Sequence, residues 1–491
     1  MDRSFTGAID LDSCGTVPLY RQIYEQLREA ILTGTLKPGT KVPPSRVMAQ
    51  ELGLSRTTII NAVDQLVAEG YLGARQGSGT FVTGWQRELE GRKPESATRS
   101  SPPARHSFVS KQWKLRLAQG KATERPSKPR PLRPGIPDLD EFPAILWARL
   151  MRRASLAQSA DAAGYGFLSG HPDLRTALAG HLTEYRLVDT SPGDIIVTSS
   201  AQAALDLISR LLIEPDDPVW IEDPGYRGAR SAFLNAGAKL IPIPVDGDGM
   251  APDRAPSPPT PKLIYVTPSH QYPLGHTLSL ARRLEILELA EAANAIIIED
   301  DYDSEFHYEG RPIAALQGLR KSSNVIYVGT FSKALLPGLR LGYMAVPPAL
   351  TSAIKALQRS TGHYASAGLQ IAAAEFINAG HYRSHVRRMQ SLYHKRRDTL
   401  ISAIDSELPG LLTPLRPQGG MQLAGFLPKR RDDTALAEML IKEGVEVDPL
   451  SSFFIGRPKQ RGFLMGYAAW PEDQIEHAIK TMRVVLERSS S

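Results

Sequence analysis

The stretch Gly329-Thr-Phe-Ser-Lys333-Ala-Leu-Leu-Pro-Gly-Leu-Arg340-Leu-Gly342 decides how the larger part of this 491-residue chain is interpreted. Upstream lies the apolar run Ala295-Ile-Ile-Ile-Glu-Asp-Asp-Tyr302, which predicts a buried strand. Asp300 precedes Lys333 by 333 − 300 = 33 residues. That separation lets a second strand bring both side chains to one edge of a sheet, so we expect a carboxylate and a lysine to lie together.

A lysine that can lose its proton and combine with an aldehyde is what pyridoxal 5′-phosphate (PLP) requires, and a carboxylate against the pyridine nitrogen keeps the ring cationic. Lys333 is the candidate for the Schiff base, and Asp300 is the candidate for the pyridine nitrogen. A phosphate group also needs a helix N-terminus and a cation. The sequence offers Ser200-Ala201-Gln202, Thr330, Ser332 and Arg340 for the phosphate, Tyr226 to stack on the ring and Tyr302 as a hydroxyl near the ring oxygen.

Each of these residues also has an ordinary structural explanation. Most lysines are solvated surface charges, Asp300 could cap a turn, Tyr226 could belong to the core and Arg340 could be a surface cation. The set is harder to explain in this way, because its members fall at strand ends of one α/β sheet, where ligands bind in open sheets. The sequence therefore predicts a PLP site, and no metal site is expected.

From Pro131 onward, apolar runs of strand length alternate with helical patterns, which predicts an α/β sheet with mainly parallel strands. Past Pro347 the pattern becomes mostly helical and predicts a smaller α+β part. The expected helices include 201–212, 227–235, 280–292 and 472–486. The expected strands are 195–198, 218–221, 240–243, 263–266, 295–298, 325–328 and 341–346, with 420–427, 445–447 and 463–467 in the smaller part.

The first eighty residues follow a different pattern. Helices are expected over 18–32, over 45–52 with Ser45 as N-cap, and over 56–69 with Ser55 as N-cap and Gly70 at its end. Two β-prone runs around a glycine-rich turn predict a hairpin, so the whole indicates a winged helix-turn-helix, although pattern alone also allows a plain three-helix bundle. The residues expected to contact double-stranded DNA are Arg46, Ser55, Arg56, Thr57, Thr58, Asn61, Arg75 and Gln76.

Residues 84–130 show no periodicity and are rich in Pro, Ser, Arg and Lys. They are expected to form a basic, flexible linker, whose charge either attracts phosphate groups or only keeps it solvated. Cys14 is the only cysteine, which excludes an intramolecular disulfide and fits a reducing cytoplasm. The chain starts with no apolar signal core and contains no run of about 18 apolar residues, so no membrane association is expected.

Several motifs resemble known families. Leu36-Lys-Pro-Gly-Thr-Lys-Val-Pro-Pro-Ser-Arg46 and Gly53-Leu-Ser-Arg-Thr-Thr-Ile59 resemble the GntR-family winged helix. Glu222-Asp-Pro-Gly-Tyr226, Thr267-Pro-Ser-His-Gln-Tyr-Pro-Leu-Gly275 and the stretch around Lys333 resemble fold-type I aminotransferases. Together they resemble the MocR/GabR regulators, in which a winged helix is fused to such a domain.

That resemblance implies a DNA-binding domain at 15–83, the linker at 84–130 and a PLP-binding domain at 131–488, with a large part at about 160–346 and a small part at 347–488. It also implies a head-to-tail homodimer that acts in the bacterial cytoplasm, at the nucleoid. Transcription would then respond to PLP itself or to an amino compound that reacts with PLP, in the control of vitamin B6 or amine metabolism.

Two positions depart from the aminotransferase pattern. Tyr272 stands where these enzymes usually carry an asparagine near the ring oxygen. Leu464 stands where they usually carry the arginine that binds the substrate carboxylate, although Arg457 or Arg461 could substitute for it. We therefore expect weak or absent transamination of ordinary α-amino acids.

Three functions remain open from the sequence. A PLP-dependent transcriptional regulator is favoured by the fused winged helix. An active aminotransferase whose head is vestigial, or only tethers it to DNA, is the second. A DNA-binding protein whose large domain is only a dimerisation scaffold is the third, and Lys333 with Asp300 and Arg340 argues against it.

Overall fold

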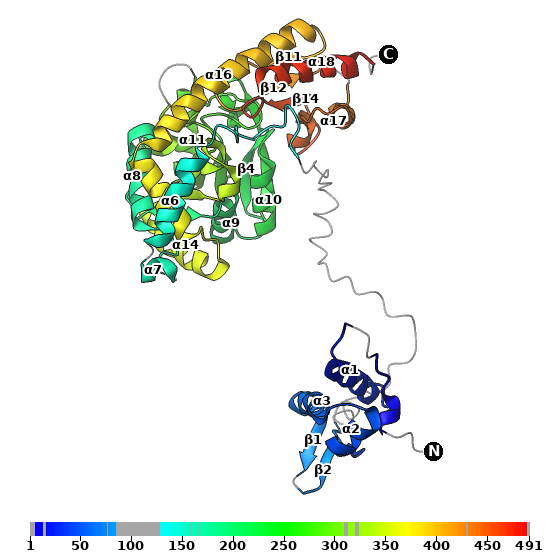
Figure 1. The fold of residues 1–491 in the computed structure, drawn as a ribbon. Helices are drawn as coiled ribbons and strands as arrows, with labels where there is room; N and C mark the ends of the chain where they lie inside the picture. The colour runs from blue at the N-terminus through cyan, green and yellow to red at the C-terminus, as the bar shows by residue number, and fades with distance from the viewer. Residues whose placement is uncertain are drawn as a thin grey trace. The chain divides into compact units, whose positions relative to one another are not determined.

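The computed structural model describes residues 5–12, 16–75, 77–84, 128–157, 159–164, 166–308, 313–319, 324–428 and 431–488. The chain divides into two compact units, Met1–Thr123 and Glu124–Ser491, and each unit is described by itself (Figure 1). Most of the expected linker lies outside the described residues, as do Gln76 and Cys14.

The first unit packs three helices beside an antiparallel hairpin. The helices are α1 (Leu19–Leu32), α2 (Ser45–Leu52) and α3 (Arg56–Ala68), and the hairpin joins β1 (Leu72–Arg75) to β2 (Gly79–Val82). The apolar positions that set the helical pattern, among them Ile23, Leu27, Ile59 and Leu66, are buried in one core. These elements confirm the winged helix-turn-helix expected from the sequence.

One capping prediction in this unit is wrong. Pro44, not Ser45, precedes α2 as its N-cap, and no side chain caps that helix. A side-chain cap must come from the extended residue directly before the helix, and Pro44 occupies that place. The hydroxyl of Ser45 instead accepts a hydrogen bond from Arg56 Nε at 3.2 Å, while Ser55 caps α3 as expected by accepting from the Thr58 N–H.

The second unit is built on a mixed eight-stranded sheet in the order β3-β10-β9-β8-β7-β4-β5-β6. Strands β9, β8, β7, β4 and β5 are parallel, whereas β10 runs antiparallel to both β3 and β9, and β6 runs antiparallel to β5. All seven strands expected for this part are present within a few residues. Their bounds are β3 (Ile195–Thr198), β4 (Pro218–Asp223), β5 (Lys239–Asp246), β6 (Gly249–Met250), β7 (Leu263–Val266), β8 (Ile296–Asp301), β9 (Val325–Thr330) and β10 (Gly342–Ala345).

Both faces of this sheet are covered by helices, as the near-continuous apolar runs require. One apolar cluster joins Ile221 and Phe233 on the side of α9 and α10, and another joins Trp220 and Leu287 on the side of α11. Helices α14 and α15 follow Pro347 in the chain yet pack against α9, α8 and α6 of the large part. The helices are α6 (Ala144–Leu156), α7 (Ala160–Ala163), α8 (Pro172–Arg186), α9 (Ala201–Leu212), α10 (Arg227–Ala236), α11 (Leu280–Ala292), α12 (Leu316–Leu319), α14 (Pro348–Thr361) and α15 (Ala367–Asn378).

The small part carries a four-stranded antiparallel sheet in the order β11-β12-β14-β13. The long helix α16 (His381–Glu407) runs from the large part to this sheet (Figure 1). The other elements are β11 (Thr413–Pro414), β12 (Gln422–Phe426), α17 (Asp433–Lys442), β13 (Asp448–Pro449), β14 (Gly462–Gly466) and α18 (Glu472–Arg488). The strand expected at 445–447 is wrong, because Val445 and Val447 are buried by side-chain packing and the ladder begins only at Asp448.

Within the described residues, no helix combines the length and the apolar character needed to cross a bilayer.

Candidate functional site

One cavity of about 1090 Å³ opens where β8 and β9 end and α9 begins. The carboxyl ends of neighbouring parallel strands share one sheet edge, so residues far apart in the sequence meet there. All ten residues expected to hold a cofactor line this cavity: Lys333, Asp300, Tyr302, Tyr226, Tyr272, Ala201, Gln202, Thr330, Ser332 and Arg340.

Lys333 lies on the short helix α13 (Phe331–Ala334), directly after β9. Thr330 caps this helix by accepting a hydrogen bond from the Ser332 N–H at 3.1 Å. The Lys333 ammonium donates to the backbone carbonyl of Gly135 at 2.6 Å. Gly135 has a φ of +77°, which L side chains rarely adopt, and a Cβ there would lie 2.9 Å from Lys333 Nζ, so any larger residue would strain this turn and displace the ammonium group.

Asp300 carries the least satisfied carboxylate of the cavity. Its Oδ2 accepts a hydrogen bond from the Tyr265 hydroxyl at 2.6 Å, while Oδ1 is buried without a hydrogen-bond partner in the described part of the chain. Burial raises the pKa of Asp300 to about 6, and Tyr265 and Lys333 oppose that rise. A cationic N–H group in the cavity would satisfy Oδ1 and favour the charged form of this carboxyl.

The Tyr302 hydroxyl contacts a buried histidine that is paired with a carboxylate. His270 Nδ1 lies 3.0 Å from the Tyr302 hydroxyl and 3.0 Å from Asp303 Oδ2, and both His270 and Asp303 are buried. A proton on Nδ1 faces the carboxylate and the tyrosine oxygen together, which leaves the Tyr302 O–H free to donate into the cavity. No local pattern predicts this pair, because it depends on how the loop after β7 folds back onto the end of β8.

An aromatic wall closes one side of the cavity. The Tyr272 ring meets the rings of Tyr226, Tyr302 and Phe453 edge-on, with centroids 5.4 to 5.7 Å apart. Burial raises the pKa of Tyr226 to about 12, so its hydroxyl stays protonated. These residues leave an aromatic face that a planar ring can contact.

The start of α9 provides backbone N–H groups at the cavity. Ser200 caps α9 by accepting from the Ala203 N–H at 3.1 Å, so the first N–H groups of the helix remain available for an anion. A Cβ on Gly342 would lie 2.7 Å from Ala201 N, so only glycine lets β10 approach this turn so closely. Arg340 is exposed at the cavity and forms no ion pair within the described residues.

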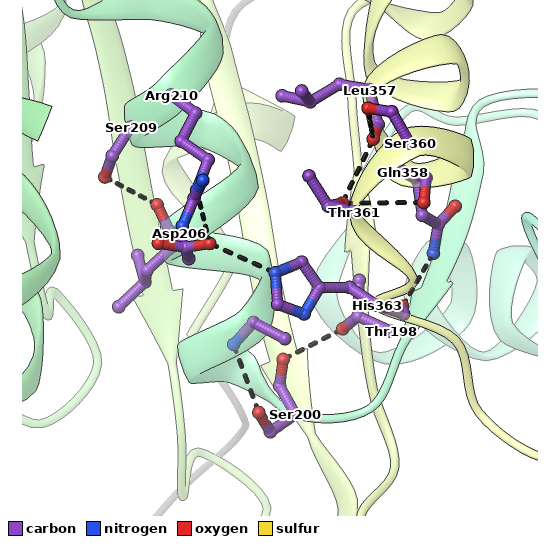
Figure 2. Close-up of polar contacts among 12 residues, drawn as sticks. Thr198, Ser200, Asp206, Ser209, Arg210, Leu357, Gln358, Ser360, Thr361 and His363 are labelled. Atoms are coloured by element: carbon purple, nitrogen blue, oxygen red, sulfur yellow. Dashed lines mark hydrogen bonds and ion pairs between the residues drawn. The ribbon is translucent and has the colours of Figure 1, made fainter. Parts of the chain in front are cut away.

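A polar network behind α9 fixes this turn against α14 (Figure 2). The Thr198 hydroxyl donates to the Ser200 carbonyl at 2.9 Å, and buried Gln358 donates to the Val197 carbonyl at 2.7 Å. His363 Nε2 lies 3.0 Å from Asp206 Oδ2 on α9, as Figure 2 shows. Gln358 on α14 thus holds the carboxyl end of β3, and His363, just after α14, holds the middle of α9, so the turn between β3 and α9 is supported on both sides.

Residues just after the linker also line the cavity, which the sequence did not predict. We call residues 129–139 the strap, because Pro129, Arg133, Pro134, Gly135, Ile136 and Leu139 line the cavity from its far side. Backbone bonds anchor the strap to the small part: Glu446 N–H donates to the Pro131 carbonyl at 2.9 Å, and Gly466 N–H donates to the Leu132 carbonyl at 2.8 Å. The strap follows directly on the expected linker, where composition alone gave no reason to expect a cofactor contact.

The first unit presents most of the residues expected to contact DNA on its surface. Arg46, Arg56, Thr57, Asn61 and Arg75 are exposed, as is Ser55. Thr58 is half-buried and its hydroxyl lies 2.8 Å from Ser55 Oγ. On the wing, Arg75 lies over the Phe81 ring at 5.3 Å, and Gln76 lies outside the described residues.

Comparisons with known proteins identify a family for each of the two units and relatives that contain both. The model for bacterial regulatory proteins of the gntR family matches residues 19–82, and the model for aminotransferase class I and II matches residues 132–482. The probable rhizopine catabolism regulatory protein MocR of Rhizobium meliloti is 40% identical over 96% of this chain and 94% of its own length. This chain belongs to the MocR-type GntR regulators.

A further regulator and a solved aminotransferase are also similar to this MocR-type chain. The pyridoxine biosynthesis regulator PdxR of Corynebacterium glutamicum is 31% identical over 92% of this chain and 93% of its own length. Among solved structures, the multiple substrate aminotransferase of Thermococcus profundus is 28% identical, covers 78% of this chain and 98% of its own, and superposes with a TM-score of 0.71. The second unit therefore has the fold-type I aminotransferase fold, whose members hold PLP.

On the side of the cavity near β14, the sequence predicts Leu464 in place of the carboxylate-binding arginine of aminotransferases. Leu464 is fully buried on β14 in an apolar cluster with Phe453 and Leu274, directly opposite Asp448 on β13. Neither Arg457 nor Arg461 lines the cavity, and Arg461 pairs with Asp432 at 3.2 Å. The arginines that do line this side are already beside acids: Arg133 lies 3.4 Å from Glu446, and Arg227 lies 3.3 Å from Asp448.

Proposed function

We propose that this chain is a PLP-responsive transcriptional regulator, in which the winged helix binds promoter DNA and the aminotransferase-like unit holds PLP covalently through Nζ of Lys333. The single observation that carries the proposal is that Lys333 lines one cavity with Asp300, whose Oδ1 has no hydrogen-bond partner among the described residues, in a chain that also has a GntR winged helix. As a DNA-binding regulator, it would act at the bacterial nucleoid.

The residues of the cavity fit PLP in kind and number. Asp300 would meet the pyridine nitrogen, Tyr302 would donate to the ring oxygen, and the aromatic wall with Tyr226 would lie against the ring. The backbone N–H groups of Ala201 and Gln202, with Thr330, Ser332 and Arg340, would hold the phosphate. When bound, PLP supplies an aldehyde carbon that combines with primary amines and a ring that withdraws electrons.

Sensing, rather than catalytic turnover, is the role we assign to this cavity. A buried leucine at the position of the carboxylate arginine cannot bind a carboxylate, and each of the two other arginines on that side already lies beside an acid. Ordinary α-amino acids would therefore be bound weakly. The signal would be PLP itself or an amine that reacts with it, and the active form would be a head-to-tail homodimer.

An active aminotransferase is the second candidate, and it is favoured by the similarity of the second unit to a solved aminotransferase. The two proposals differ in turnover. Incubation of the PLP-loaded protein with common amino acids should release no keto acid beyond one equivalent per cofactor. Rapid release over many equivalents would support the enzyme and contradict a purely sensing role.

The strap offers a route by which the cofactor acts on the linker. Lys333 Nζ donates to the Gly135 carbonyl, and covalent attachment of PLP would use the same nitrogen. Attachment would therefore change the contact between Lys333 and the strap, close to where the chain continues toward the DNA-binding unit. An effector shifts the DNA-bound state only through its different affinity for the two states.

Borohydride reduction followed by peptide mass spectrometry tests the attachment. The proposal predicts one pyridoxyl adduct, on Lys333, and its loss in Lys333→Ala. Lys355→Ala is the matched control, because Lys355 also donates to a glycine carbonyl, that of Gly193 at 2.9 Å, but lies outside the cavity. An adduct on another lysine, or none at all, would contradict the proposal.

A further inference from the structure

A second cavity of about 420 Å³ lies on the opposite face of the large sheet. Successive strand residues point to opposite faces, so Asp300 lines the cofactor cavity while Asp301 faces the other side and pairs with Arg186 at 2.8 Å. The second cavity is enclosed by α8, residues 304–308, β9, β10 and the start of α16. Its volume is in the range of sites that bind small molecules.

The walls of this cavity are unusually rich in tyrosine: Tyr185, Tyr308, Tyr327, Tyr343 and Tyr382 all line it. Tyr327 and Tyr343 stack on adjacent strands with centroids 6.5 Å apart and form the floor. A Cβ on Gly329 would lie 2.4 Å from the Tyr343 ring, so the glycine on β9 makes room for that ring to lie along the sheet. Aromatic faces grouped in this way attract organic cations.

One carboxyl group stands inside this aromatic cage. Glu305 Oε1 accepts a hydrogen bond from the Tyr382 hydroxyl at 2.8 Å, and Gln390 fixes the Glu305 backbone carbonyl at 2.6 Å. Burial, reinforced by the nearby charge of Asp301, raises the pKa of Glu305 to about 7, and the Tyr382 hydroxyl and Arg186 oppose that rise. A cationic nitrogen in the cage would favour the charged form of this carboxyl.

The outer rim of the cavity has the opposite charge. Arg383 and Arg387 are exposed and stand four residues apart on α16, on one face of the helix. Arg383 lies over the Tyr185 ring at 5.5 Å and only loosely approaches Glu184, at 3.9 Å. Arg387 forms no ion pair in the described part of the chain, so its guanidinium group is available to an anion, with that of Arg383 one turn away on the same face.

We infer that this cavity binds a small zwitterion, with its cationic nitrogen between the tyrosines and Glu305 and its carboxylate at Arg383 and Arg387. An amino acid or a betaine has this arrangement of charges. The site does not depend on PLP, because no residue that lines it belongs to the cofactor cavity.

Titration calorimetry of the full-length protein with glycine betaine tests this inference. Betaine has no N–H bond and cannot combine with an aldehyde, so its binding reports a non-covalent site whether or not Lys333 carries PLP. Tetramethylammonium and propionate each carry only one of the two charges and should bind more weakly than betaine. Glu305→Gln should weaken betaine binding by about 10-fold or more, because it removes the negative charge beside the quaternary nitrogen.

Substitutions on α16 separate the site from a general charge effect. Arg387→Gln should weaken betaine binding but leave tetramethylammonium binding unchanged. Arg388→Gln is the control, because Arg388 is also exposed on α16 but lies beside Glu141 and does not line the cavity. If Glu305→Gln fails to fold, judged by circular dichroism, the Arg387 and Arg388 variants decide. Absence of betaine binding to the wild type, or equal binding to Arg387→Gln and wild type, would overturn the inference and leave PLP attachment at Lys333 unaffected.

Discussion

Asp300→Asn should change the stability of the cofactor-free protein and its affinity for PLP in opposite directions. Burial raises the pKa of Asp300 from its ordinary 3.8 to about 6. The folded state therefore holds this proton more tightly than the unfolded state, and stability falls as pH rises from about 4 to about 6 and stays low above that. The difference between a pKa of 3.8 and one of about 6 corresponds to roughly 3 kcal/mol of unfolding free energy. Because asparagine is neutral at every pH, Asp300→Asn should raise the free energy of unfolding at pH 7.5 by at most this amount.

With PLP bound, the same substitution removes a charge-assisted hydrogen bond to the pyridine nitrogen. Such a bond contributes about 1.5–3 kcal/mol, so the affinity for PLP should fall roughly 10- to 100-fold. Urea unfolding of the cofactor-free proteins at pH 4.5 and 7.5 measures the first effect, and PLP titration followed by absorbance measures the second. Glu222→Gln is the control, because burial raises the pKa of Glu222 to about 7 but this residue lies outside the cavity.

The control should resemble Asp300→Asn in its pH-dependent stability and the wild type in its affinity for PLP. Equal affinity of Asp300→Asn and the wild type for PLP would exclude a contact between Asp300 and the pyridine nitrogen. A stability of the cofactor-free wild type that does not fall between pH 4.5 and 7.5 relative to the Asn variant would exclude the raised pKa of Asp300.

Three further predictions concern single residues. Gly135→Ala places a Cβ 2.9 Å from Lys333 Nζ at a φ of +77°. It should therefore lower the free energy of unfolding in urea by about 1 kcal/mol or more and slow PLP attachment. An unchanged rate of PLP attachment would show that the strap does not control Lys333. His270→Phe removes the imidazole that orients the Tyr302 hydroxyl toward the cavity, so the pH midpoint of the bound PLP absorbance should rise by roughly one unit. His363 lies away from the cavity, so His363→Phe should leave this midpoint unchanged. Arg56→Gln should weaken DNA binding and lower the slope of log affinity against log salt by about one if Arg56 contacts a phosphate, and an unchanged slope would exclude that contact.

The residues of the cofactor cavity could be predicted because they share strand ends. Apolar runs locate β8 and β9, and the rule that ligands bind at the carboxyl edge then brings Asp300, Tyr302 and Lys333 together. The direction of a strand is not contained in such a run, so the antiparallel course of β10 became visible only in the structure. Period and composition report which residues are buried, but not which neighbours they meet.

The features that were missed all depend on contacts between distant, irregular segments. Gly135 meets Lys333 across 198 residues of sequence, from a strap without periodicity. His270 reaches Asp303 through a loop whose path no local pattern specifies. Val445 and Val447 are buried by side-chain packing, and this burial produces the same apolar pattern as a strand. Pro44, directly before α2, occupies the N-cap position that was expected for Ser45.

The most direct test of PLP-dependent DNA binding is the affinity of the full-length protein for DNA from upstream of its own gene, measured by fluorescence anisotropy with and without PLP. If PLP acts through Lys333, it should change the affinity of the wild type and of Lys355→Ala and leave the affinity of Lys333→Ala unchanged. An affinity that PLP does not alter in the wild type, or alters equally in Lys333→Ala, would contradict it.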